Sequence, residues 1–495
     1  MRLGFFLLLT LFGANAIAQP RTDAVETYLR KEMGERHIPG MQVAVVQHEK
    51  IVFTAAYGSA DIEHSIPVTT QTLFSIASIT KAFTGVAIMQ LVERGRIDLD
   101  APVSQYLGDL PTPWQGVTIR QLLTHVSGIP DIVDPNNGKI VGDGSPQTFL
   151  AKANSLPLDF AAGDRFSYNQ TNYLLLGRVI EKLRGTSFAQ FVTAKQLDIS
   201  GMRNTFFGGF SDIVKDRAQP YALRPDFANQ VDANQWVNIF YESVPSLVAG
   251  NGLNTSAEQT ANWLIALQKG RLLREGESIA TLWTPGVLND GTHGGFGGPL
   301  NGYALGWPVI TRSTHRAVAP IGGNWAAIFV YPDDDLSIVV LTNLQGAHPE
   351  SFVDELAGYF VGDIRNAAGF GIPHSIKALQ AELVLRGFDR AVEVVDAPRN
   401  KEMKAQLSES DVNAWGYRLM GKGQRTQALE IFKLNMHLYP ASGNTYDSLA
   451  DAYENAGNRN LAIENYRESL RRSPNNQNAA QHLKDWAATG QHAAQ

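Results

Sequence analysis

An unusually apolar helix near the start of the chain limits the possible folds more than any other feature. Residues 78–94 have helical character, and between Ala82 and Val92 only Thr84 and Gln90 carry polar side chains. A helix without a polar face has to be covered by protein on all sides. The sequence therefore predicts a large domain built around this helix, and 495 residues are enough to build one.

Strand patterns stand on both sides of that helix in the sequence. They fall at residues 41–48 and 51–57, joined by a tight turn around Glu49-Lys50, and again at 303–310, 326–331 and 336–342. Helices are expected at 23–36 and 350–361, and residues 95–300 mix short helices with long loops such as 134–144 and 289–301. This order predicts an α+β domain, with an antiparallel sheet flanked by helices and a helical lobe at 95–300.

The end of the chain carries a repeat with a period of 34 residues. Four residues recur at this spacing: Gly423, Ala428, Phe432 and Pro440 return as Gly457, Ala462, Tyr466 and Pro474. The period and the spacing resemble tetratricopeptide repeats, in which paired helices stack side by side. We expect two units over 409–474, a capping helix at 475–488 and a degenerate helix pair at 374–398. Such a module is expected to pack against the preceding domain and to offer a binding surface to a protein partner.

The first eighteen residues predict an export signal. Met1-Arg2 is positively charged, residues 3–12 are largely apolar, and Ala16 and Ala18 have the spacing of a signal-peptide cleavage site. We therefore expect a signal peptide at 1–18, a hydrolase domain at 19–372 and a repeat module at 373–495, in a periplasmic or secreted protein. No other window is apolar for long enough to predict a membrane span.

Composition excludes several kinds of site and partner. The chain has no cysteine, so it forms neither disulfides nor thiolate metal sites. Its net charge is −6 and its charges are interspersed, without the basic stripe that binds nucleic acid. No metal or cofactor motif is found, and Asp333, Asp334 and Asp335 between two strands predict a hairpin turn. The glycine-rich residues 294–298 follow no strand and are expected to form a flexible loop.

The start of the apolar helix carries a chemical motif. Ser78-Ile79-Thr80-Lys81 is the only S-x-x-K in the sequence. Alone it also fits a serine that caps the helix and a solvated lysine. A spacing of three residues, however, places both side chains on one helix face. Because the helix is otherwise apolar, Lys81 needs a partner or loses its proton, and a neutral amine beside a hydroxyl activates a nucleophile.

Two further blocks extend this motif into a family resemblance. The segments Phe74 to Lys81, Leu122 to Pro130 and Phe166 to Gly177 resemble the serine β-lactamase and penicillin-binding protein superfamily. The resemblance covers about residues 20–365 and is strongest to class C β-lactamase-related esterases and peptidases. It implies that Tyr168 lies against the nucleophile and shuttles its proton. Gln170 stands where the family has a substrate-positioning asparagine, and His125 falls in a block that has a structural role.

The third motif of that family is altered here. Its K-T-G or H-x-G sequence corresponds to Pro320-Ile321-Gly322-Gly323, so Pro320 replaces the cation. Gly322 and Gly323 are kept, and the resemblance implies that they approach the substrate and that the N–H groups of Gly323 and Ser78 form an oxyanion hole. Three basic residues are near enough in sequence to replace the cation: Arg312, His315 and Arg316. Each of them is more typical of a solvated loop residue.

The sequence thus predicts a cofactor-free serine hydrolase that forms an acyl-enzyme with esters or unusual amides. Ser78 is the expected nucleophile, Lys81 with Tyr168 the base, and Gln170, Gly322 and Gly323 the residues that bind substrate. A β-lactamase or D-Ala peptidase is the alternative within the same family. An alternative of another class is a repeat-mediated binding protein with an inert hydrolase domain.

Overall fold

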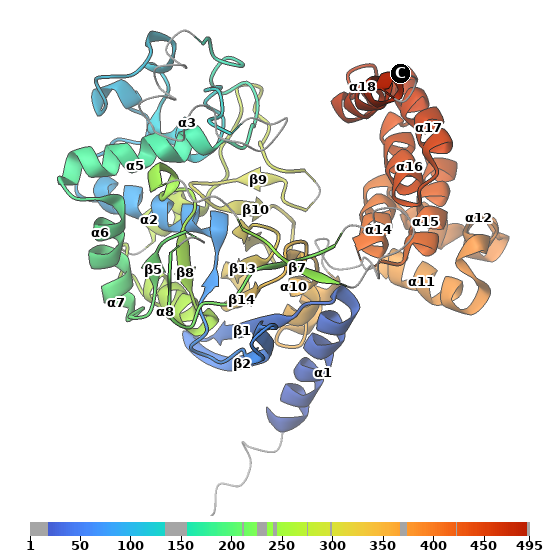
Figure 1. Ribbon diagram of the computed structural model, residues 1–495, viewed down its shortest axis with the longest axis horizontal. Helices are drawn as coiled ribbons and strands as arrows, with labels where there is room; N and C mark the ends of the chain where they lie inside the picture. Colours follow the sequence, from blue (N-terminus) through green and yellow to red (C-terminus); the bar gives the residue numbers. More distant parts are fainter. Residues whose placement is uncertain are drawn as a thin grey trace, which may run out of the picture.

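A long antiparallel sheet forms the middle of the first domain (Figure 1). The computed structural model of the chain describes residues 18–133, 156–209, 212–224, 235–240, 245–274, 276–297, 299–366, 374–421 and 423–492. Its main sheet has the order β3-β2-β1-β14-β13-β11-β10-β9, and β12 pairs with β13. The strands are β1 (Gly40–Gln47), β2 (Lys50–Asp61), β3 (Ile66–Pro67), β9 (Gly302–Tyr303), β10 (Pro308–Ile310), β11 (Ala317–Val318), β12 (Ile321–Gly322), β13 (Ala326–Tyr331) and β14 (Leu336–Thr342). The two ends of the domain sequence meet where β1 pairs with β14.

Both faces of this sheet are buried, because successive residues of its central strands enter different cores. Ala44 and Val46 of β1 belong to one apolar cluster, whereas Val43 and Val45 belong to the other. The first cluster is completed by α2 (Thr80–Val92), α5 (Gln170–Arg184) and α8 (Ala257–Gln268). The second is completed by α1 (Ala18–Arg36) and α10 (Glu350–Ala357). The result is a sheet between two helical layers, which confirms the predicted α+β fold class.

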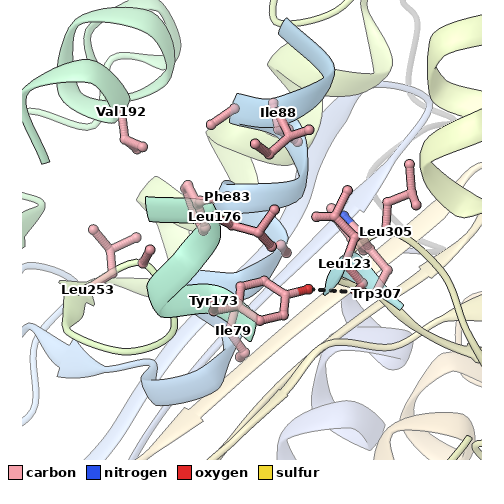
Figure 2. Packing of buried hydrophobic residues seen from close by; sticks show 14 of the residues in the cluster. Ile79, Phe83, Ile88, Leu123, Tyr173, Leu176, Val192, Leu253, Leu305 and Trp307 are labelled. Carbon is pink, nitrogen blue, oxygen red and sulfur yellow. Dashed lines mark hydrogen bonds between the residues drawn. The ribbon is translucent and has the colours of Figure 1, made fainter. Parts of the chain in front are cut away.

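Helix α2 lies in the centre of the larger core, as its apolar sequence predicts. Every residue from Thr80 to Leu91 is buried. Phe83 stacks on Trp263 of α8 with ring centroids 3.9 Å apart. Figure 2 shows Phe83 and Ile88 among side chains of neighbouring elements, including Tyr173 of α5, whose hydroxyl donates a hydrogen bond of 3.0 Å to Leu123 O. This packing holds the start of α2 in a fixed position.

The lobe between α2 and the last strands is only partly helical. Its helices are α3 (Ile119–Leu123), α5, α6 (Phe188–Val192), α7 (Asp198–Ser200), α8 and α9 (Glu277–Trp283). It also contains two small sheets, one of β4 (Phe74–Ser75), β8 (Leu253–Thr255) and β5 (Phe206–Phe207), the other of β6 (Tyr221–Leu223) and β7 (Trp236–Asn238). These strands are too short to produce a visible alternation of polar and apolar residues.

Two other sequence predictions are refined by the structure. The expected strand at 303–310 is a hairpin, because Ala304 N donates to Trp307 O and separates β9 from β10. The three aspartates do form the turn between β13 and β14. Their carboxylates accept from Arg316, His315 and His48. Residues next to β1 and β11 thus bind the carboxylates of this acidic turn.

A separate set of helices follows the first domain (Figure 1). They are α11 (His374–Arg386), α12 (Ala391–Asp396), α13 (Lys401–Gln406), α14 (Glu409–Gly421), α15 (Arg425–Leu438), α16 (Gly443–Asn455), α17 (Arg459–Arg472) and α18 (Gln477–His492). The pairs α14–α15 and α16–α17 occupy the two predicted repeat units, and their cores share no residue with the sheet domain. The tetratricopeptide assignment and the protein partner remain predictions.

The two predicted domain boundaries, after residues 18 and 372, lie at or within residues that the structure does not describe. The proposed signal peptide lies almost entirely outside the described residues, as does the division between 372 and 373. Among the helices that are described, none combines the length and the apolar character needed to cross a membrane.

Candidate active site

Ser78 lies in a short 3-10 helix, Ala77–Ile79, that leads directly into α2. The preceding residue, Ala77, has φ of +43°, which is unfavourable for a residue with a Cβ. The turn is held from several sides: Thr80 Oγ1 donates to Ala77 O at 2.7 Å, and Ile76 N donates to Leu253 O at 3.0 Å. Such over-determined strain is common where a side chain must be presented in one orientation. Here it presents Ser78, which is half-buried.

Lys81 is buried one helical turn from Ser78. Its Nζ lies 3.3 Å from Ser78 Oγ, 2.9 Å from Gln170 Oε1 and 2.9 Å from Gly250 O. Burial lowers the pKa of Lys81 to about 7, although the charge of Asp131 opposes this shift. The amide and backbone oxygens can only accept hydrogen bonds. When the amine is neutral, they therefore take its two N–H groups, and its lone pair is left to accept the Ser78 hydroxyl proton.

Tyr168 and Gln170 reach this pair from the start of α5. Asn169 caps α5, because its side chain accepts from Asn172 N at 3.1 Å. The Tyr168 ring centroid is 4.8 Å from Lys81 Nζ. Burial raises the pKa of Tyr168 above its ordinary value, although the side chains of Ser78 and Gln170 are close enough to lower it in part, so the phenol keeps its proton at neutral pH. Gln170 contacts Lys81 directly, and its predicted contact with substrate remains a prediction.

His125 lies behind Tyr168 in an aromatic cluster. Its Nδ1 accepts from Asn169 N at 3.1 Å, and its ring centroid is 4.4 Å from that of Tyr168 and 4.8 Å from that of Tyr303. Burial lowers the pKa of His125 well below its usual range, so the ring is neutral. This arrangement fits the structural role that the family resemblance implied, since the ring supports the turn that carries Tyr168.

Gly322, the last residue of β12, and Gly323, which follows it, have different surroundings. A Cβ on Gly322 would lie 2.0 Å from Ile76 O, so only glycine lets β12 pack this closely against the turn before Ser78. Gly322 therefore positions the strand against the protein itself. Gly323 lies in the wall of the pocket that contains Ser78. Its N–H as part of an oxyanion hole remains a prediction.

That pocket has a volume of about 330 Å³ and combines apolar and polar walls. Its lining residues are Ser78, Tyr168, Phe296, Leu300, Tyr303, Gly306, Pro308, Pro320, Ile321, Gly323, Asn324, His348 and Glu350. Pro320 thus lies in the wall, and the described lining contains no lysine or arginine. Phe296, whose ring centroid is 5.2 Å from that of Tyr168, belongs to the glycine-rich segment that the sequence predicted only as a loop.

The three basic residues considered as replacements for the cation are bound elsewhere. Arg312 donates to both oxygens of the buried Asp354, at 3.1 and 3.2 Å, so it is a buried ion pair and not a solvated loop residue. His315 pairs with Asp334 at 2.8 Å, and Arg316 pairs with Asp333 at 3.0 Å. None of the three lines the pocket.

Sequence reasoning missed several residues around Lys81 and the pocket. Gly250 supplies a carbonyl to Lys81, and a Cβ on it would lie 3.3 Å from Lys81 Nζ. Asp131 accepts from Gln170 N at 3.0 Å, and burial raises the pKa of its carboxyl group. The polar pair His348 and Glu350 was also missed. The two glycines in Gly250-Asn251-Gly252 could have indicated that the backbone approaches another group closely there. The sequence around Asp131, His348 and Glu350 carried no recognisable pattern.

One group in the helical tail has the composition of a metal site. Ligand atoms of Asp451, Glu454 and His482 lie within 4.8 Å of one another. These atoms already have protein partners, because Tyr466 OH donates to Asp451 at 2.5 Å and to Glu454 at 3.0 Å, and His482 Nδ1 lies 3.0 Å from Glu454. The cluster is accounted for by hydrogen bonding between the repeat helices.

Comparison with known proteins identifies the family. Residues 25–361 match the protein family described as Beta-lactamase, and this is more than half of the chain. The chain belongs to the β-lactamase family. Its first domain therefore has the β-lactamase/transpeptidase-like fold that its sequence motifs predicted.

The chain is similar to several known proteins. Protein flp of Staphylococcus aureus (strain MW2) is 27% identical over 345 residues, which cover 67% of this chain and 65% of flp. Esterase EstB of Burkholderia gladioli is 34% identical over 230 residues, 43% of this chain and 57% of EstB. The octameric penicillin-binding protein homologue of Pyrococcus abyssi superposes with a TM-score of 0.58 at 26% identity, covering 69% of this chain and 77% of that protein. The chain thus matches only about two thirds of the length of its curated relative flp.

Proposed function

We propose that the protein hydrolyses carboxylic esters or unusual amides through an acyl-enzyme on Ser78. The observation that carries this proposal is the hydrogen bonding of Lys81, whose two carbonyl-type acceptors leave its lone pair to Ser78 when the amine is neutral. Burial brings the pKa of Lys81 to about 7, so a large fraction of the amine is neutral at physiological pH.

The proposed reaction moves one proton around three side chains. Ser78 Oγ attacks the carbonyl carbon while its proton passes to Lys81 Nζ. The bond to the leaving group then breaks, Tyr168 gives its proton to the departing oxygen or nitrogen, and Lys81 returns a proton to Tyr168. Water attacks the acyl-enzyme by the reverse relay, which releases the acid and restores the Ser78 hydroxyl.

The walls of the pocket support neutral substrates. A carboxylate would find Pro320 at the position where the family resemblance implied a cation, and the described lining provides no lysine or arginine in its place. Apolar and aromatic side chains, among them Phe296, Tyr303 and Ile321, are suited instead to an uncharged acyl group. The similarity to EstB is consistent with an esterase.

A penicillin-recognising enzyme is the second candidate, because a penicillin-binding protein homologue has the same fold at 26% identity. One experiment separates the two. The protein is incubated with a fluorophosphonate or a fluorescent penicillin, and the adduct is located by intact mass and peptide mapping. We expect a fluorophosphonate adduct on Ser78 and little acylation by penicillin. Stable penicillin acylation of Ser78 would favour the second candidate, and an adduct on another serine would disprove the assignment of the nucleophile.

An inert hydrolase domain with an active repeat module is less well supported, since Ser78, Lys81 and Tyr168 are all in mutual contact.

We also propose that the protein is exported and begins near Gln19 after cleavage. N-terminal sequencing of protein recovered from a periplasmic or culture fraction tests this, and retention of Met1 there would contradict it.

A further inference from the structure

The pocket that contains Ser78 has a second polar side, formed by His348 and Glu350. His348 follows β14, and its backbone N–H donates to Asn324 O at 2.9 Å, next to Gly323. Its φ is +48°, a value that non-glycine residues rarely adopt unless their surroundings impose it. Glu350 is the first residue of α10. Backbone contacts therefore hold both residues in the pocket wall.

The contact between the two side chains fixes the form of the imidazole. His348 Nδ1 lies 2.8 Å from Glu350 Oε1. A carboxylate can only accept, so Nδ1 carries a proton toward Glu350; in the tautomer with that proton alone, Nε2 is the acceptor. The His348 side chain is 46% exposed, whereas that of Glu350 is 10% exposed. The imidazole is thus the part of the pair that a substrate can reach.

Glu350 adds negative charge behind that acceptor. Its Oε2 is buried and has no hydrogen-bond partner among the residues that the structure describes. Glu350 lies in the first turn of α10, where the positive N-terminal end of the helix favours negative charge. Because the Glu350 carboxyl group occupies the N-terminal end of α10, this helix end is not available to a carboxylate of the substrate. The electrostatics of this side of the pocket favour a positively charged hydrogen-bond donor.

We infer that His348, oriented by Glu350, accepts a hydrogen bond from a protonated amine on the acyl group of the substrate. This inference rests on the proposed ester or amide hydrolysis at Ser78 and narrows its substrate class to amino-substituted acyl groups. The aromatic walls formed by Tyr168, Phe296 and Tyr303 add to the attraction for an ammonium group. His348 is a specificity residue in this scheme, and proton transfer remains with Lys81 and Tyr168.

Matched p-nitrophenyl esters test the inference in the full-length protein. The rigid series consists of 4-(aminomethyl)benzoate, 4-ethylbenzoate and 4-(carboxymethyl)benzoate, and the flexible series of 6-aminohexanoate, heptanoate and monopimelate. Within each series only the charge at the far end changes. We expect kcat/KM in at least one series to be about tenfold or more higher for the amine than for its neutral isostere, the scale of one hydrogen bond to a charged group.

Variants assign that preference to the proposed pair. His348→Phe keeps a ring but removes the acceptor, and Glu350→Gln keeps the size but removes the charge. Both should reduce the ratio of amine to neutral ester to near one. His48→Phe is the matched control, because His48 forms the same kind of pair with Asp335 outside the pocket, and its ratio should equal that of the wild type. Fluorophosphonate labelling of Ser78 reports whether each variant folds.

The possible outcomes are distinct. A ratio that His348→Phe and Glu350→Gln leave unchanged overturns the inference, and so does a wild-type preference for the carboxylate esters. If the wild type hydrolyses none of the esters and Ser78 is not labelled, the proposed function itself fails.

Discussion

In the proposed reaction, the protonation of Lys81 decides whether Ser78 can react. A lysine needs to be neutral to act as a base, and burial lowers the pKa of Lys81 to about 7. We therefore expect kcat/KM for a neutral p-nitrophenyl ester to rise with pH through about 7 and to be lost below it. Lys81→Arg should reduce kcat/KM by about two orders of magnitude or more at every pH, because guanidinium does not lose its proton. Activity within a few-fold of the wild type would mean that another group is the base.

Gln170 offers a sharper test of the same titration. Its Oε1 lies 2.9 Å from Lys81 Nζ, so Gln170→Glu would place a negative charge beside the amine with little change in shape. A neighbouring carboxylate stabilises the ammonium form and raises the pKa of Lys81. The rise in kcat/KM should therefore move to higher pH by about one unit or more. Gln170→Asn, which stays neutral, serves as the control and should titrate near the wild-type value. Identical pH profiles for Gln170→Glu and the wild type would show that Lys81 is not the titrating group.

Strand β12 carries the altered family motif beside the turn that presents Ser78. Gly322 packs the strand against the turn before Ser78, and Pro320 precedes it in the pocket wall. Pro320 O accepts from Ile328 N at 2.9 Å, so the backbone is held by β13 whichever side chain stands at position 320.

Pro320→His should therefore change the pocket without displacing the strand. We expect the wild type to have a higher kcat/KM for p-nitrophenyl butyrate than for nitrocefin, which carries a carboxylate. Pro320→His should narrow this gap by roughly tenfold to a hundredfold, the value of one charge-assisted hydrogen bond. Pro320→Ala, which removes the ring but adds no donor, should leave the ratio unchanged. A wild-type preference for nitrocefin would contradict the esterase assignment.

At the scale of the whole molecule, the helical tail packs against α1 and α10. Lys377 of α11 lies 3.6 Å from Glu355 of α10, and Arg418 of α14 is buried beside α1, where desolvation and the charge of Arg36 lower its pKa. A cavity of about 660 Å³ lies between these four helices. The contact surface is on the side of the second core, whereas Ser78, Lys81 and Tyr168 lie beside the first.

A chain that ends at Gly371 should consequently keep the proposed esterase activity. We expect kcat/KM for p-nitrophenyl butyrate within about threefold of the full-length value, and a melting temperature lower by several degrees because helices α1 and α10 lose their cover. Circular dichroism and thermal unfolding give the second quantity. A shortened protein that is folded but inactive would show that the tail contributes to the site.

Features that depend on neighbours along the chain could be predicted from the amino-acid sequence. The apolar stretch after Ser78 predicted the central helix, and the three-residue spacing predicted the contact between Ser78 and Lys81, because helix geometry alone brings such residues together. The strands 326–331 and 336–342 were predicted with the bounds that the structure has, since both are continuous apolar runs. Tyr168 was found through the family resemblance.

The distant residues that surround Ser78 and Lys81 could not be predicted, because the folding of the chain brings them together. Gly250 and Lys81 are 169 residues apart, and Asp131 and Gln170 are 39 apart, so neither contact has a local pattern. His348 and Glu350 reach the pocket because β14 pairs with β13 and brings the start of α10 beside Gly323. Arg312 had the right charge and sequence position to face the substrate, but the buried Asp354 binds it elsewhere. A side chain's role depends on which partners the fold places within reach, and sequence separation does not report that distance.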